Sequence, residues 1–445
     1  MKNSVKKCLT ILISFFLFVS NVFAAESFEN VLHKSVNFIE KNQFDKTTSN
    51  YWQGEWPVQM YSYMLPAILG VGRLWAKPTE ESTAFATSSI VNLLSESYLY
   101  NPSLSKIPTL IKNAMESTNH YKSGSVFNYY NKVSFRNKMV NGPLDPEYVP
   151  GFIQGLTNIP SDADTTSVTF TALALQELIL KGSPLKSYPL NEETLATYSK
   201  FRDLNRSPHY YNRLDGFNTT GAYLTWFLDE KSSSMPRNLF AKPDKGQRIP
   251  FNINDVDCVV NANILRLLSM TGHTNTNGYN DSCQFINKAI LNEKQSQCGI
   301  YYPNSYAVFY TASNVYTYDR SCVEDSKEKA VDFILSTQNS DGSWSNEPGI
   351  GRTDQVQSTA LAISALINYT HHDQLQALSS IRYGVRYLLR QMKVKNSEEV
   401  YWKGEVFFSA IAQARNTVLW RSDAYTTALV LSTLIKAEKV LNGNL

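Results

Sequence analysis

Several common signals are scarce or missing in this sequence. Cysteine occurs five times and histidine six times in 445 residues. The formal net charge is only +3, which gives no electrostatic case for binding nucleic acid. Beyond the first 24 residues, no apolar run is long enough to span a membrane. These absences leave a chain of ordinary globular composition that can build a large core.

Metal and nucleophile motifs are also missing. No Cys-x-x-Cys pair occurs, and no H-E-x-x-H or G-x-S-x-G motif is present. The sequence therefore predicts no metal site and no cofactor. Aromatic residues, in contrast, are abundant, with 26 Tyr, 22 Phe and 7 Trp. They can form an ordinary core or line a cavity for a cation, a polyene or a sugar.

The first 24 residues look like a secretory signal. Lys2, Lys6 and Lys7 precede an apolar stretch, and a small-residue cleavage site follows at Ala24. We expect residues 1–24 to be removed, with an uncleaved anchor as the alternative, and the protein to be exported to the periplasm or outside the cell. We expect no membrane span in the mature chain.

Cysteine usage agrees with an exported protein. Cys8 falls within the signal, so four cysteines remain and allow up to two disulfides. Cys283 and Cys322 each follow a serine at the start of a predicted helix, and this shared position favours their pairing. Cys258 and Cys298 are the other two candidates, and the sequence leaves open which of the three possible connectivities forms.

Two kinds of helix recur along the chain. Segments 35–43, 330–338 and 384–392 are amphipathic, as expected for helices with one wet face. Segments 165–180, 259–270, 358–369 and 426–435 are rich in Ala, Ser and Thr and carry hardly any charge, so they should be buried on all sides. Alternating half-wet and buried helices predict two concentric layers that stack or close.

Gly/Trp turns connect the helices. QNSDGSW spans residues 338–344, and a longer version spans 43–56. The pentapeptide from Tyr51 to Glu55, with Trp52, nearly repeats the one from Tyr401 to Glu405, with Trp402. Such a match between the first and last units favours a closed ring over an open array.

These turns, together with the STALAISAL helix that follows QNSDGSW, resemble the QW-type repeats of the terpenoid cyclase and protein prenyltransferase superfamily. The resemblance implies an all-α fold, an α/α toroid of about six helical hairpins around a central cavity. It covers most of the chain, so we expect one domain over residues 25–445, with long loops near 121–161 and 230–254.

Paired aspartates precede two of the buried helices. Asp162 has a repeat counterpart in Asp423, so we interpret it as a helix N-cap, which leaves Asp164 without a structural reason. At the second pair we expect Asp255 to be the cap and Asp257 the surplus carboxylate. Both surplus groups should lie on one rim of the ring.

The two pairs are similar to the D-x-D-D motif of class II terpene cyclases, in which the middle Asp protonates an alkene or epoxide. The resemblance implies that Asp164 or Asp257 is the acid, with Asp162 or Asp255 as its partner. The last Asp of the motif is Thr165 in one copy and Cys258 in the other. Oligomeric state and substrate do not follow from the sequence.

Three functions remain open at this point. One is acid-initiated cyclisation or binding of an isoprenoid. The second is a non-catalytic toroid that holds a small apolar ligand or a partner. The third is a carbohydrate-active enzyme that uses paired carboxylates. Further cavity candidates are Glu55, Glu405, Trp52, Trp402 and Tyr425, and for the two glutamates a role in turn geometry competes with catalysis.

Overall fold

The computed structural model describes residues 27–62, 78–143, 158–206, 216–217, 219–230, 243–249, 254–346, 354–370, 375–410 and 418–442. The predicted signal at residues 1–24 and most of the predicted loop at 230–254 lie outside these ranges. Among the described helices, none is long and apolar enough to cross a membrane.

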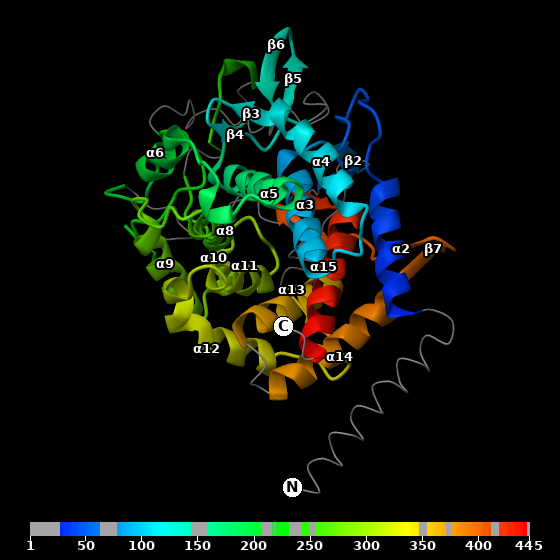
Figure 1. Cartoon of the computed structure of the whole chain (residues 1–445). Coiled ribbons are helices and arrows are strands. Elements are labelled where there is room, and N and C mark those ends of the chain that lie inside the picture. Colours follow the sequence, from blue (N-terminus) through cyan, green and yellow to red (C-terminus); the bar gives the residue numbers. More distant parts are fainter. Residues whose placement is uncertain are drawn as a thin grey trace, which may run out of the picture.

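Six helices form an inner layer (Figure 1). They are α3 (Ala84–Tyr100), α5 (Ala163–Lys181), α8 (Cys258–Met270), α11 (Tyr306–Tyr316), α13 (Gln355–Thr370) and α15 (Asp423–Leu441). Each packs against the next in this order, and α15 packs against α3, so the sequence of contacts returns to its start. The four weakly charged segments predicted to be buried helices are confirmed as α5, α8, α13 and α15.

A second set of helices lies outside the first (Figure 1). Its members are α2 (Phe28–Lys41), α4 (Ile107–Ser117), α6 (Glu192–Lys200), α9 (Tyr279–Leu291), α12 (Arg320–Ser336) and α14 (Leu375–Gln391). A short helix, α10 (Gln295–Cys298), precedes α11. The three amphipathic segments are confirmed as α2, α12 and α14, each with a buried face and a wet face.

The expectation of an all-α fold is wrong in one respect, because strands are also present. A four-stranded antiparallel sheet has the order β2 (Thr79–Glu81), β1 (Val58–Ser62), β10 (Val418–Arg421), β9 (Val406–Ser409). Three two-stranded hairpins comprise β3 (Lys122–Ser123) with β4 (Val126–Phe127), β5 (Lys132–Phe135) with β6 (Lys138–Asn141), and β7 (Lys393–Asn396) with β8 (Glu399–Tyr401). Extended segments beside buried helices must pair their backbone groups, and these strands do so.

The Gly/Trp turns tie three of the outer helices, α2, α12 and α14, to the structure that follows them. The Trp344 indole N–H donates to the Ile334 carbonyl oxygen at 2.7 Å, and Trp402 does the same to Leu388 at 2.7 Å. In the first repeat this bond is made by Trp56, which donates to Ile39 at 2.8 Å. The pairing of Trp52 with Trp402 is therefore wrong, because Trp52 instead stacks on His120 with ring centroids 3.4 Å apart.

Two disulfides join helices on one side of the molecule. Cys283 pairs with Cys322 and links α9 to α12, as the sequence predicts. Cys258 pairs with Cys298 and links α8 to α10. Disulfides persist in oxidising compartments, which is the setting expected for an exported chain.

A buried cluster of charges connects three inner helices. Glu96 on α3 accepts hydrogen bonds from Arg266 on α8 at 2.7 Å and from Lys436 on α15 at 2.5 Å. All three side chains are buried. Burial alone would raise the pKa of Glu96, but the two cations outweigh it and hold this pKa below its ordinary value. The cluster joins α3 to α8, which are not neighbours in the inner layer.

Glu96→Gln should destabilise the protein strongly, because two buried cations would lose their anion. Removing one partner of a buried ion pair costs about 3–5 kcal/mol, and we expect a loss of this size in urea unfolding. The matched control is Glu40→Gln in the exposed Lys106–Glu40 pair, where we expect a change below about 1 kcal/mol. Equal losses in the two variants would contradict the special role of the cluster.

Candidate functional site

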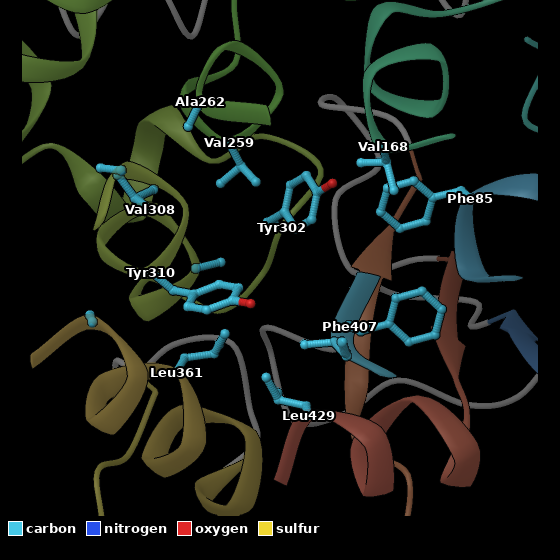
Figure 2. Close-up of a cluster of buried hydrophobic side chains, with 14 of the residues drawn as sticks. Phe85, Val168, Val259, Ala262, Tyr302, Val308, Tyr310, Leu361, Phe407 and Leu429 are labelled. Atoms are coloured by element: carbon cyan, nitrogen blue, oxygen red, sulfur yellow. The ribbon is translucent and has the colours of Figure 1, made fainter. Parts of the chain in front are cut away.

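Apolar side chains from all six inner helices meet at the centre of the molecule (Figure 2). Phe85 comes from α3, Val168 from α5, Leu361 from α13 and Leu429 from α15. Helix α8 contributes Val259 and Ala262, and α11 contributes Val308 and Tyr310. All of these side chains are buried, and those in Figure 2 point toward one another. We call this set, with Tyr302 and Phe407, the central cluster.

Aromatic rings form one wall of the central cluster, around Phe408 on β9. Its ring centroid lies between 5.2 and 6.0 Å from those of Phe85, Tyr129, Tyr301, Tyr302 and Trp420. Phe408 is nevertheless partly accessible, as are Asn263 on α8 and Tyr425 on α15. Partly accessible side chains beside buried ones indicate open space at this wall.

Asp164 lies in the first turn of α5 and is buried against this wall. Its Oδ2 accepts a hydrogen bond from the Tyr302 hydroxyl at 2.5 Å, and its Oδ1 accepts one from the Asn263 amide at 2.8 Å. Burial raises the pKa of Asp164 to about 7, the two hydrogen bonds oppose this rise, and the charge of Asp257 adds to it. A carboxyl with such a pKa is partly protonated near neutral pH and can serve as a general acid.

The structure confirms Asp162 as the N-cap of α5, since its Oδ1 accepts a hydrogen bond from the Thr165 amide at 2.6 Å. Burial raises the pKa of Asp162 to about 8. The assignment of Asp423 as the matching cap is wrong. Ser422 caps α15, and Asp423 accepts a hydrogen bond from the Gly404 amide at 2.6 Å.

The two roles assigned at the second aspartate pair are reversed in the structure. Asp257 is the N-cap of α8: its Oδ1 accepts from the Val259 and Val260 amides at 2.7 and 3.0 Å. Asp255 is the non-capping carboxylate, and its Oδ2 accepts from the Tyr301 hydroxyl at 2.5 Å. The helix begins two residues later than a cap at Asp255 would place it, so the cap moves from the first aspartate to the second.

Asp255 and Asp257 are both buried, and burial raises the pKa of Asp255 to about 7 and that of Asp257 to about 6. Tyr301 connects them, because its amide donates to Asp257 Oδ2 at 3.0 Å while its hydroxyl donates to Asp255. Tyr301 and Tyr302 are consecutive, so one short segment holds Asp255, Asp257 and Asp164.

Glu55 and Glu405 occupy different environments despite the matching pentapeptides. Glu405 accepts hydrogen bonds from the Val356 and Gln357 amides at 3.1 and 2.7 Å and so caps α13. Burial and the charge of Asp354 raise the pKa of Glu405 to about 8. Its contacts are those of a helix cap, which agrees with a role in turn geometry.

Glu55 is buried next to the start of α3. It accepts hydrogen bonds from the Ser82 hydroxyl at 2.6 Å, from the Trp52 amide at 3.0 Å and from the Tyr121 hydroxyl. Burial raises the pKa of Glu55 to about 7. These partners join the first Gly/Trp turn to the inner layer, and none of them belongs to the central cluster.

Of the two remaining cavity candidates, Trp402 lies in a turn and Tyr425 lies at the aromatic wall. Trp402 is fully buried under α14 and α15, where its two hydrogen bonds hold the turn. Tyr425 lies at the aromatic wall, with its ring 4.6 Å from that of Phe407, and Asp164 raises its pKa further after burial. The described residues contain no group of His, Cys, Asp and Glu side chains suited to a metal ion.

Sequence reasoning missed Tyr302, Asn263 and Phe408. Tyr302 and Asn263 lie 138 and 99 positions from Asp164, so no local pattern links them to it. The sole signal at Tyr302 is the doublet Tyr301-Tyr302 before Pro303, and nothing in that doublet specifies an aspartate partner.

No family model and no curated protein match this sequence. Solved structures do match. The type II terpene cyclase MstE from Scytonema, in complex with geranylgeranyl dihydroxybenzoate as substrate, has a TM-score of 0.57 at 13% identity over 93% of this chain and 98% of that chain. A protein from Actinoplanes has a TM-score of 0.52 at 13% identity over 92% of this chain and 99% of that chain.

Cellobiose 2-epimerase from Bacillus thermoamylovorans also matches, with a TM-score of 0.50 at 12% identity over 91% of this chain and 98% of that chain. Identities this low show a common fold and leave the activity open. The chain therefore has the terpenoid cyclase type of α/α fold, which a cellobiose epimerase shares.

Proposed function

We propose that the protein binds an isoprenoid-type ligand in the central cluster and that Asp164 is the acid that starts its cyclisation. The observation that carries this proposal is the Asp164 carboxyl, held between the Tyr302 hydroxyl and the Asn263 amide at an aromatic wall. We further propose that residues 25–445 form one closed toroid that acts after export.

The proposed chemistry starts with proton transfer. The Asp164 O–H bond breaks, and a new C–H bond forms at one carbon of a substrate alkene, leaving positive charge on the neighbouring carbon. The carboxylate that remains keeps its two hydrogen-bond donors, which stabilise the negative charge. The next alkene closes a ring onto the cation, and loss of a proton ends the reaction with no net change in atoms.

The aromatic wall suits a cationic intermediate. Ring faces attract a positive charge within about 6 Å of their centroids, and the effect grows when water is excluded. Phe408 and Tyr302 lie at this wall, with centroids 5.7 Å apart. Neither ring is a base strong enough to end the reaction early by removing a proton.

The carbohydrate alternative is weaker at this site. The central cluster is mainly aliphatic and aromatic (Figure 2). A sugar would leave many hydroxyl groups without partners there, and each buried unpaired polar group is costly. A non-catalytic toroid would bind the same apolar ligand through the same contacts. It would differ only in that no proton is transferred from Asp164.

Asp164→Asn should abolish turnover and preserve binding. The amide keeps the shape of the carboxyl but has no proton to transfer, so we expect product from linear polyprenyl substrates, including geranylgeranyl dihydroxybenzoate, to fall by a factor of about 100 or more. Product is measured by gas or liquid chromatography with mass spectrometry, and binding by quenching of tyrosine and tryptophan fluorescence.

The matched control is Asp423→Asn, an exposed first-turn aspartate on another inner helix. It should leave product formation unchanged. Binding without product in the unmodified protein would favour the non-catalytic toroid. Binding of oligosaccharides but not of polyprenyl compounds would overturn the isoprenoid proposal.

The pH dependence tests the protonation state of the acid. Burial raises the pKa of Asp164 to about 7, so the protonated, active form dominates below that pH and is lost above it. We expect product formation to be level on the acidic side of pH 7 and to fall about tenfold per pH unit on the alkaline side. The profile is recorded as single-turnover rate over the pH range in which circular dichroism shows a folded protein. A fall that begins near pH 4 would contradict a raised pKa.

Mass spectrometry of ligands that co-purify with the protein gives an independent test. We expect a prenyl or polyene lipid in extracts of the unmodified protein. Its amount should fall when Leu361→Asp places a charge in the central cluster, because an apolar chain does not displace water from a carboxylate. Recovery of an oligosaccharide instead would contradict the proposal.

A further inference from the structure

A second site lies on the outside of the molecule, where the QNSDGSW turn packs against α14. A pocket of about 470 Å³ is lined there by Ser340, Asp341, Tyr383, Arg386, Tyr387, Arg390 and Gln391. Ser340 and Asp341 belong to the turn, and the other five residues belong to α14. The pocket is therefore remote in structure from Asp164, which is on the inner helix α5.

The turn is held rigidly against the helix. Gly342 has φ +91°, and a Cβ at this position would come within 2.5 Å of the Tyr383 carbonyl oxygen. The Asp341 Oδ1 accepts hydrogen bonds from the Ser343 amide at 3.0 Å and the Ser343 hydroxyl at 2.7 Å. Arg390 donates to the Asp341 carbonyl oxygen at 2.6 Å. These contacts fix the walls of the pocket before any ligand binds.

The pocket is rich in positive charge. Arg382, Arg386 and Arg390 follow one another at intervals of four on α14, so they share one face of the helix. Residues 375–391 include no Asp or Glu. Like charges at this spacing destabilise a helix by a few tenths of a kcal/mol per pair.

The first repeat shows that the turn does not require these arginines. There Gly54 packs against the Asn113 carbonyl oxygen as Gly342 packs against that of Tyr383. The Gln43 amide donates to the Leu110 carbonyl oxygen, as that of Gln338 does to Ser380. Both contacts give the same alignment of α4 with α14.

In this alignment Glu116 stands where Arg386 does, and His120 where Arg390 does. The same kind of turn therefore packs onto a helix with an acidic residue at the first of these positions, while His120 lies beyond the end of α4, in the 3-10 segment Thr118–Tyr121. The first repeat thus forms the same turn without an arginine at the position of Arg386, whereas Arg390 also helps to hold the turn through its bond to the Asp341 carbonyl oxygen.

The remaining groups narrow the class of ligand. The Tyr383 side chain is 52% exposed and offers an apolar ring face, and the Arg386 guanidinium lies 5.7 Å from its centroid. Asp341 has a lowered pKa: burial tends to raise it, but the hydrogen bonds from Ser343 and the charge of Arg390 prevail, so the carboxylate is ionised. These groups together match a sugar with an acidic substituent. The aromatic ring can stack on the sugar, the carboxylate can accept hydrogen bonds from its hydroxyl groups, and the guanidinium groups can bind its anion.

We propose that this pocket binds an acidic saccharide unit, with the sugar ring on Tyr383, its hydroxyl groups on Asp341 and its carboxylate or phosphate on Arg386 and Arg390. A guanidinium group has five N–H donors in a planar fork that suits both anions. The site is independent of the proposed cyclase function, and its occupant differs from the ligand of the central cluster.

Isothermal titration calorimetry with the full chain tests the proposal. Galacturonate and glucose 6-phosphate should bind, whereas glucose and inorganic phosphate should each bind about tenfold more weakly, because each lacks one half of the recognised chemistry. Arg386→Ala and Tyr383→Ala should each weaken galacturonate binding by about tenfold or more. Circular dichroism of the Arg386→Ala and Tyr383→Ala variants checks that each one is folded.

The matched control is Glu116→Ala at the equivalent position of the first repeat, which should leave galacturonate binding unchanged. Absence of galacturonate binding at millimolar concentration would overturn the proposal. So would retained binding in Arg386→Ala. Inorganic phosphate binding as tightly as glucose 6-phosphate would overturn the saccharide assignment. Polyprenyl binding should be the same in all these variants, so failure here leaves the proposed function of the central cluster standing.

Discussion

The mutual burial of six mainly apolar inner helices is the constraint on which the rest of this structure depends. Such a helix has no face that favours water, so each inner helix must be covered on every side. Neighbouring inner helices cover two sides, the outer layer covers a third, and the fourth faces the centre. The packing of α15 against α3 joins the last inner helix to the first. Without it, an apolar face of each of these two helices would be exposed to water.

This arrangement also determines where the buried aspartates lie. Aspartates at the starts of α5 and α8 have two different uses. Asp162 and Asp257 satisfy amide groups that the helix leaves unpaired. Asp164 and Asp255 instead take their hydrogen bonds from tyrosine hydroxyls on one two-residue segment. The capping and the non-capping carboxylates thus lie side by side, and their hydrogen-bond partners distinguish them.

Much of the fold follows from the sequence, because the period and composition of a helix report directly on which of its faces are wet. The four buried helices and three of the amphipathic outer helices were predictable for that reason. The Cys283–Cys322 pair was predictable for another, because both cysteines follow a serine at the start of a helix. The cap at Asp162 was predictable too, but the caps at Asp257 and Ser422 were not, since a shift of one or two residues in the start of a helix changes the capping residue. The tryptophans of the first repeat show a similar limit of sequence reasoning. The matching pentapeptides pair Trp52 with Trp402, but Trp56 makes the hydrogen bond to the preceding helix that Trp402 makes in its own repeat. The partners of Asp164 come from segments that only the folded chain brings together.

The packing of α15 against α3 has a consequence for how the chain is made. Glu96 and Lys436 are 340 positions apart, and strand β1 pairs with β10 across a similar separation. Synthesis proceeds from the N-terminus, so α3 must wait for nearly the whole chain before its last neighbour exists. Contacts between residues this far apart in the sequence offset the entropy cost of loop closure only when they form, at the end of folding. During that interval the apolar side of α3 is exposed to whatever surrounds the growing chain, which makes the nascent protein a natural client for chaperones that shield apolar surface.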